Sequence, residues 1–77
     1  MITMVDFKLN ANGLKCPMPV LKTKNVIKTM QSGQTLEVIA DDMGAKSDIP
    51  ALLSKVDCTL VEMKEESGKL TFLIKKN

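Results

Sequence analysis

The sequence predicts an α+β fold, a two-layer α/β sandwich in which two helices cover one face of a four-stranded mixed sheet. Four segments have the apolar patterns of strands and two have helical spacing, in the order β-α-β-α-β-β. The opening strand–helix–strand unit predicts a parallel pair of strands. Glu66-Ser67-Gly68 predicts a hairpin between the last two strands. The 77 residues are therefore expected to form a single domain, 1–77, with one modest core.

The first strand is predicted over residues 3–9, where apolar and polar residues alternate. Its apolar members share one face: Val5, Phe7 and Leu9. Residues 10–13 interrupt this pattern with asparagine and glycine, so we expect a loop there.

The first helix is predicted over residues 17–30. Proline suits the first helical position, where its missing N–H costs nothing, so Pro17 is assigned to that position and Cys16 to the N-cap. One apolar stripe follows from the spacing: Val20, Thr23, Val26, Ile27 and Met30, with Leu21 on its flank. Lys24 projects beside this stripe, either as a long side chain passing the edge of the core or as a cation that docks a partner.

The second strand is predicted over residues 35–40, after a helix end with Gly33 as a left-handed cap. Its alternate residues Leu36, Val38 and Ala40 face one way and Ile39 the other, as in an interior strand. The acidic pair Asp41-Asp42 follows. Paired carboxylates can serve acid–base chemistry or a metal, but they more often cap a following helix, and the further oxygen ligands that Mg²⁺ or Ca²⁺ needs are not evident.

The second helix is predicted over residues 45–56, with Asp48 as a local cap and Pro50 in a first turn. The last two strands are predicted over residues 59–65 and 69–75. In this interpretation Leu60 and Leu73 point away from the helices, either as scattered surface residues or as part of a partner surface.

Cys16 is the candidate reactive residue. The N-terminus of a helix presents free N–H groups and the positive end of the helix dipole, and both stabilise a thiolate. Lys15 adds a neighbouring positive charge. These conditions lower the pKa of a cysteine and make it a nucleophile. The alternative is an inert capping residue, but cysteine caps helices poorly compared with Ser, Thr, Asp or Asn.

The composition excludes several other chemistries. The absence of histidine excludes Cys-His catalysis and most zinc sites, and two cysteines alone make a poor metal site, so no metal and no cofactor are expected. All eleven basic residues are lysine and there is no Trp or Tyr, which argues against a nucleic-acid reader. The N-terminus lacks the pattern of a signal peptide, and no apolar run could span a membrane. We expect a cytoplasmic monomer with reduced thiols.

Cys16-Pro17-Met18-Pro19 resembles the CPxP motif of the TusA/SirA-like family of small sulfur carriers. The similarity covers nearly the whole chain. Further matching positions are Gly13-Leu14 before the cysteine, Met30, Gly33, Leu36 and Val38, and the later Asp41-Asp42 and Asp48-Ile49-Pro50.

The resemblance implies a βαβαββ sandwich and a persulfide carried on Cys16. It implies a relay, with little turnover of its own, from a cysteine desulfurase or a rhodanese-like donor to an acceptor protein, for tRNA thiolation or sulfur oxidation. Lys24, Asp41 and Asp48 become candidates for contacts with these partners, alongside Met18. No direct contact with nucleic acid or membrane is implied.

Three residues, at two places in the chain, depart from the family pattern. Met43 stands where relatives frequently have proline, and Asp57-Cys58 stands where many have Gly-His. Cys58 keeps a second hypothesis open, a thiol redox protein that pairs it with Cys16, although a buried structural thiol is the commoner role. A third hypothesis is a non-enzymatic regulatory adaptor that binds partners through Leu60, Leu73 and the lysines.

Overall fold

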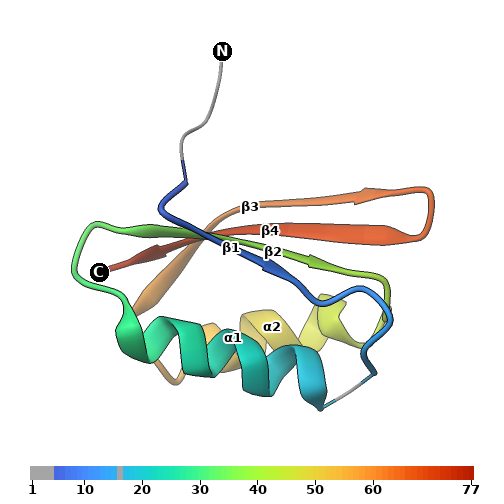
Figure 1. The fold of residues 1–77 in the computed structure, drawn as a ribbon, viewed down its shortest axis with the longest axis horizontal. Helices are drawn as coiled ribbons and strands as arrows, with labels where there is room; N and C mark the ends of the chain where they lie inside the picture. The colour runs from blue at the N-terminus through green and yellow to red at the C-terminus, as the bar shows by residue number, and fades with distance from the viewer. Residues whose placement is uncertain (1–4, 16) are drawn as a thin grey trace.

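The structure, a computed structural model, describes residues 5–15 and 17–77. A four-stranded sheet forms one layer, and two helices form the other on a single face of that sheet (Figure 1). This arrangement confirms the predicted two-layer βαβαββ sandwich. The elements in chain order are β1 (Phe7–Asn10), α1 (Met18–Thr29), β2 (Thr35–Ala40), α2 (Ala45–Leu53), β3 (Cys58–Glu66) and β4 (Lys69–Lys76).

The sheet is mixed, as predicted, with the strand order β1-β2-β4-β3. β1 and β2 run parallel, with Phe7 opposite Leu36. β4 lies between β2 and β3 and is antiparallel to both. Because β1 and β2 are parallel, the loop that follows β1 and the loop that follows β2 leave the sheet at the same edge.

The core lies between the sheet and the helices. Alternate residues of β2 and β4 face the helices and are fully buried: Leu36, Val38, Ala40, Leu70, Phe72 and Ile74. Helix α1 contributes Ile27 and helix α2 contributes Ile49, both buried. Burial of each large apolar side chain stabilises the fold by about 1.5–3 kcal/mol. The one buried polar side chain in the described part of the chain is Thr23, whose hydroxyl donates to the Pro19 carbonyl at 2.7 Å.

Strand β1 begins at Phe7, later than the predicted range, of which residues 3 and 4 lie outside those described. The Asp6 carboxylate accepts the Thr35 N–H at 2.9 Å, so a side chain rather than a strand carbonyl bonds the start of β2. The predicted alternation holds, since Val5, Phe7 and Leu9 are half-buried whereas Asp6 is exposed.

Helix α1 begins one residue later than predicted. Its N-cap is Pro17, not Cys16, because the first helical hydrogen bond runs from the Leu21 N–H to the Pro17 carbonyl, at 3.0 Å. Pro19 therefore occupies the second helical position, where its missing N–H is also harmless. Cys16 itself lies outside the described residues, so its predicted place can be compared only through its neighbours.

Helix α2 differs from prediction at both ends. Its N-cap is Gly44, and Asp48 is not a cap but the fourth residue of the helix, donating its N–H to the Gly44 carbonyl at 3.1 Å. Pro50 lies inside the helix rather than in its first turn, and the helix ends at Leu53. Proline cannot donate the usual bond to the carbonyl four residues earlier. Burial of the apolar face, made of Ala45, Ile49, Leu52 and Leu53, keeps this short helix formed.

Strand β3 contains a β-bulge that overturns the prediction for Leu60. The pairing with β4 shifts from Leu60 opposite Ile74 to Glu62 opposite Leu73, which leaves Val61 as the extra residue. Leu60 consequently lies on the helix side of the sheet and packs against the core. Leu73 faces away from the helices, as predicted, because it alternates with the buried residues of β4.

Candidate functional site

The segment that leads to Cys16 is held by the sheet. The Ala11 N–H donates to the Ile39 carbonyl at 2.7 Å, which extends the β1–β2 pairing by one residue, and Ala11 is fully buried. The Leu14 N–H then donates to the Ala11 carbonyl at 3.2 Å and closes a turn. Gly13 occupies the third position of that turn with φ +81°, a value that glycine adopts without strain. The glycine before the motif therefore has a conformational role.

Asp41 connects this turn to the end of β2. Both of its carboxylate oxygens lie 3.0 Å from the Gly13 nitrogen and accept its N–H. The sequence predicts that Asp41 and Asp42 cap the second helix, and for Asp41 this prediction is wrong, because its carboxylate binds Gly13 instead. Asp42 does lie at the start of α2, where one carboxylate oxygen accepts the Gly44 N–H at 3.4 Å.

The start of α1 offers fewer free N–H groups than the sequence suggested. The Met18 N–H donates to the Lys15 carbonyl at 2.8 Å, and Pro19 has no N–H. Among the first three helical residues, at most Val20 can offer its N–H to an anion. The positive potential here comes from the helix dipole and from lysines, since residues 13–29 contain no acidic side chain.

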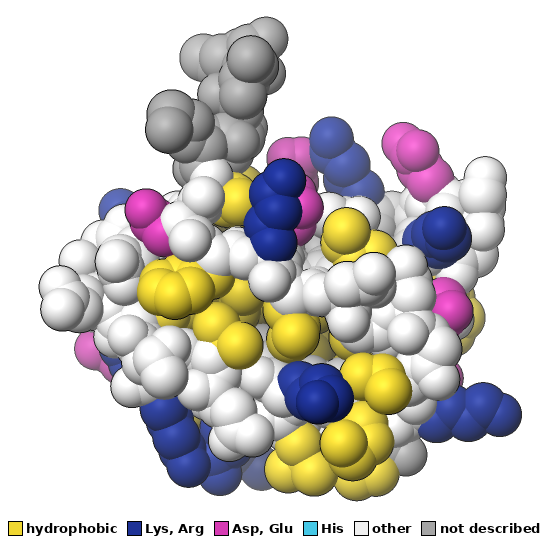
Figure 2. Space-filling view, in the orientation of Figure 1, with side chains coloured by type: hydrophobic (Ala, Val, Ile, Leu, Met, Phe, Trp, Pro, Cys, Tyr) yellow, Lys and Arg dark blue, Asp and Glu magenta, His cyan; other side chains and the backbone are white. Residues whose placement is uncertain are grey.

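An apolar surface lies at the same end of the molecule. Met18 and Leu21 are exposed to 40% and 46%, whereas Pro19 between them is buried. Figure 2 shows hydrophobic side chains gathered where α1 begins, with a basic side chain beside them. Lys24 is exposed on the same helix. Exposed apolar side chains of this kind, methionine in particular, are enriched in the surfaces through which proteins dock.

Asp48 lies near the start of α2 and is half-buried. Its carboxylate and that of Asp42 both flank Gly44, within 3.7 Å and 3.4 Å of the place where a side chain on Gly44 would begin. Asp48 is therefore part of the local structure at this helix start, and its docking role stays a prediction. Among the residues that the structure describes, no three acidic or thiol side chains are grouped as a metal would require.

Strand β3, whose first residue is Cys58, begins at the opposite end of the molecule from the start of α1 (Figure 1). Cys58 pairs with Lys76, and Lys76 bonds Gly33 and Gln34 just beyond the last turn of α1. The 12 residues of α1 span about 18 Å. A disulfide needs Cα atoms within about 7 Å, and Cys16 adjoins Pro17 at the far end of that helix. Pro17, the described neighbour of Cys16, therefore lies far from Cys58, and the residues that the structure describes give the redox hypothesis no support.

The surroundings of Cys58 are those of a structural thiol. It is half-buried against the core at the beginning of β3. Desolvation raises the pKa of this thiol above its ordinary 9.0, the Asp57 carboxylate acts in the same direction, and the Lys76 ammonium opposes them. A thiol with a raised pKa is a poor nucleophile at neutral pH.

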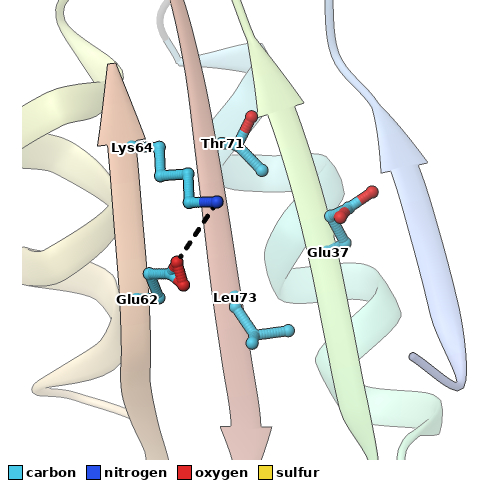
Figure 3. Close-up of a pocket in the computed structure, with 5 residues that line it drawn as sticks. All are labelled: Glu37, Glu62, Lys64, Thr71 and Leu73. Atoms are coloured by element: carbon cyan, nitrogen blue, oxygen red, sulfur yellow. Dashed lines mark ion pairs between the residues drawn. The ribbon is translucent and has the colours of Figure 1, made fainter. Parts of the chain in front are cut away.

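The face of the sheet opposite the helices carries a shallow hollow of about 90 Å³. Its lining residues are Glu37, Glu62, Lys64, Thr71 and Leu73 (Figure 3). Lys64 and Glu62 form an exposed ion pair at 3.5 Å, and the Glu37 carboxylate points away from them toward β1. The charged groups that line this hollow therefore do not point toward a common centre. The adaptor hypothesis keeps Leu73 on this face but loses Leu60.

Sequence reasoning missed the bond between Asp41 and Gly13. One signal could have found it. The chain leaves parallel β1 and β2 at the same edge of the sheet, so residues that follow these two strands are expected to meet. Gly13 and Asp41 are such residues, and 28 positions separate them in the chain.

Comparison with known proteins places these features in a family. The family model of sulfurtransferase TusA matches residues 7–76. A sulfur carrier protein TusA from Allochromatium vinosum is 47% identical over 76 residues, which cover 96% of this chain and 100% of that protein. A putative sulfur carrier protein, YrkI, from Bacillus subtilis is 44% identical over 71 residues, which cover 92% of this chain and 95% of that protein. In addition, none of the described helices is long and apolar enough to cross a bilayer.

Proposed function

The chain belongs to the TusA family of sulfur carriers, and from this premise we propose that Cys16 carries sulfane sulfur as a persulfide and relays it between two proteins. The observation that supports this most directly is the geometry around the motif. The sheet holds the turn at Gly13, and the helix begins at Met18 directly after Pro17. This short connection sits beside a helix N-terminus, where a thiolate is stabilised.

The proposed transfer is a thiolate exchange. The Cys16 thiolate attacks the terminal sulfur of a donor persulfide, R–S–SH, and a new S–S bond forms as the donor's S–S bond breaks. The products are Cys16–S–SH and the donor thiolate R–S⁻, so charge and atoms balance without an external oxidant. At delivery Cys16 takes the role of the donor: an acceptor thiolate attacks the terminal sulfur of the Cys16 persulfide, a new S–S bond forms, and the Cys16 thiolate leaves. No general base is required if the attacking sulfur is already ionised.

The residues around Cys16 have separate proposed roles. Lys15 and the α1 dipole stabilise the thiolate and the persulfide anion. Pro17 and Pro19 restrict the backbone on the helix side of the cysteine. Met18 and Lys24 contact the partner proteins, supported by their exposure on α1. Asp48 is proposed to contribute to docking at the neighbouring start of α2.

The partners are proposed by chemical class. The donor is a cysteine desulfurase or a rhodanese-like protein, and the acceptor is a protein thiol that serves tRNA thiolation or sulfur oxidation. The carrier works as a monomeric co-substrate in the cytoplasm, where a reducing environment keeps its thiols free.

Mass spectrometry tests the proposal. The wild-type protein and the variants Cys16→Ser and Cys58→Ser are incubated with glutathione persulfide, and the intact mass is measured with and without a reductant. We expect a reducible gain of one sulfur atom in the wild type and in Cys58→Ser, and none in Cys16→Ser. A gain that survives in Cys16→Ser but is lost in Cys58→Ser would refute the assignment.

A further inference from the structure

We propose that Asp41 is a positioning residue for sulfur transfer: its carboxylate binds the Gly13 N–H and thereby orients the segment that presents Cys16. This inference rests on the proposed role of Cys16 and assigns to Asp41 a part distinct from partner docking. Asp41 directly follows β2, and Gly13 lies in the turn that follows β1, so the bond joins the two loops at the carboxyl edge of the parallel pair (Figure 1).

The contact is a hydrogen bond from a backbone amide to a charged carboxylate. The Gly13 nitrogen lies 3.0 Å from each carboxylate oxygen, so the N–H is shared between two charged acceptors. The positive φ of Gly13 belongs to the same turn, which makes the direction of its N–H depend on a conformation that only glycine adopts readily. The conformation of Gly13 and the hydrogen bond to Asp41 therefore depend on each other.

The bond between Asp41 and Gly13 lies in the middle of the segment that joins β1 to α1, between the two points where this segment is otherwise held. Upstream, the sheet holds Ala11 through its bond to Ile39. Downstream, the Lys15 carbonyl accepts the Met18 N–H and joins the segment to α1. Between these points, Gly13 is the residue whose backbone is bonded to another strand's loop, through Asp41. Loss of the carboxylate would free the segment before Cys16 from the sheet while leaving both strands paired.

The chain contains a matched control at the other end of the same strand pair. The Asp6 carboxylate accepts the Thr35 N–H at 2.9 Å, so it too bonds a backbone amide between the β1 and β2 segments. Both aspartates are exposed. An alanine at either position removes a carboxylate–amide bond, and at Asp6 it also removes the weaker bond from the Thr35 hydroxyl at 3.4 Å. Only the change at Asp41 lies next to the motif.

The experiment compares Asp41→Ala, Asp41→Asn and Asp6→Ala with the wild type. Hydrogen exchange of the Gly13 amide is followed by NMR, and the rate of sulfur uptake from glutathione persulfide is followed by mass spectrometry. In Asp41→Ala we expect Gly13 exchange to accelerate about tenfold or more and sulfur uptake to slow about tenfold. In Asp41→Asn the amide oxygen still accepts the Gly13 N–H, so both values should stay within about threefold of the wild type. Asp6→Ala should leave both unchanged.

Three results would overturn the positioning role. One is equal uptake by Asp41→Ala and the wild type. Another is equally slow uptake in Asp41→Asn with Gly13 still protected, because the charge and not the hydrogen bond would then be the cause. The third is slowing by Asp6→Ala to the same extent, which would indicate a general loss of stability. Failure of the wild type to load sulfur on Cys16 would instead refute the proposed function itself.

Discussion

The two ends of the molecule have the same kinds of turn contacts, but the chain that follows these contacts differs between the two ends. At one end Asp41 bonds the Gly13 amide, and at the other Asp6 bonds the Thr35 amide. Each end also has a glycine with positive φ, Gly13 and Gly33. At the first end the chain continues into a helix start with a lysine-rich, acid-free segment. At the second end it continues into the sheet, where Cys58 begins β3 beside the core.

This difference shows how the fold sets thiol chemistry. A helix N-terminus and neighbouring cations favour the charged thiolate, whereas desolvation beside a core favours the neutral thiol and raises the pKa of Cys58. The sequence contains two cysteines of the same intrinsic reactivity. The proposed function gives sulfur transfer to Cys16, next to the start of α1, whereas Cys58 packs against the core at the beginning of β3.

Truncation of the core should affect both ends alike, and it is the largest effect we expect. Leu70 lies opposite Ala40, at the end of the molecule where α1 begins, and Ile74 lies opposite Leu36, at the end where β3 begins. Both side chains are fully buried. Leu70→Ala and Ile74→Ala should each lower the free energy of unfolding by about 2–5 kcal/mol, measured by urea denaturation. A loss below about 1 kcal/mol in either variant would show that its end does not share the common core.

The contrast between the thiols should appear in alkylation rates. At neutral pH, iodoacetamide should modify Cys16 at least about tenfold faster than Cys58, as measured by peptide mass spectrometry. The rate at Cys58 should still be rising at pH 9.0, because desolvation raises the pKa of this thiol above that value. Cys58→Ser serves as the control and should leave the Cys16 rate unchanged. Equal alkylation rates at Cys16 and Cys58 would contradict the prediction that Cys16 is the more reactive thiol.

Alanine substitutions at Gly13 and Gly33 should lower stability to a similar extent but differ in their effect on sulfur uptake. An alanine at Gly13 or Gly33 meets no atom within 4 Å but must adopt a φ above +80°. Gly13→Ala and Gly33→Ala should therefore each cost about 1–2 kcal/mol in the free energy of unfolding. Only Gly13→Ala should slow sulfur uptake, because only this change disturbs the amide that Asp41 binds. Unaltered uptake in Gly13→Ala would indicate that the turn conformation is not needed for transfer.

The smallest expected effect concerns alkaline pH. The pKa of Cys58 is raised in the folded protein, so the unfolded chain loses this proton first as the pH rises. The stabilisation is complete below the unfolded-chain pKa and is lost as the pH rises through the folded one, which lies above 9.0. Relative to Cys58→Ser, the wild type should lose a little stability in this range in thermal unfolding series. Parallel pH profiles for the two proteins would contradict the raised pKa.

Much of the fold could be predicted because the signals are local. The range of β2 was predicted to the residue, since its alternation is regular and Gly33 and Asp41 interrupt the pattern on either side. Leu60 was assigned to the wrong face because the bulge at Val61 exists only in the register with β4. Pro50 was placed in a first turn because helix propensity does not count the burial of Ile49 and Leu53 in the tertiary core.

The sequence by itself determined the types and order of the elements, the single core, the motif at Cys16 and the absence of a histidine partner. These properties follow from periodicity and residue identity, which are read along the chain. The tertiary structure alone decided that Asp41 meets Gly13, that Leu60 faces the core and that Cys58 pairs with Lys76 near the end of α1 rather than its start. Such contacts depend on strand register and on which strand ends share an edge, and these are settled only when the whole chain packs.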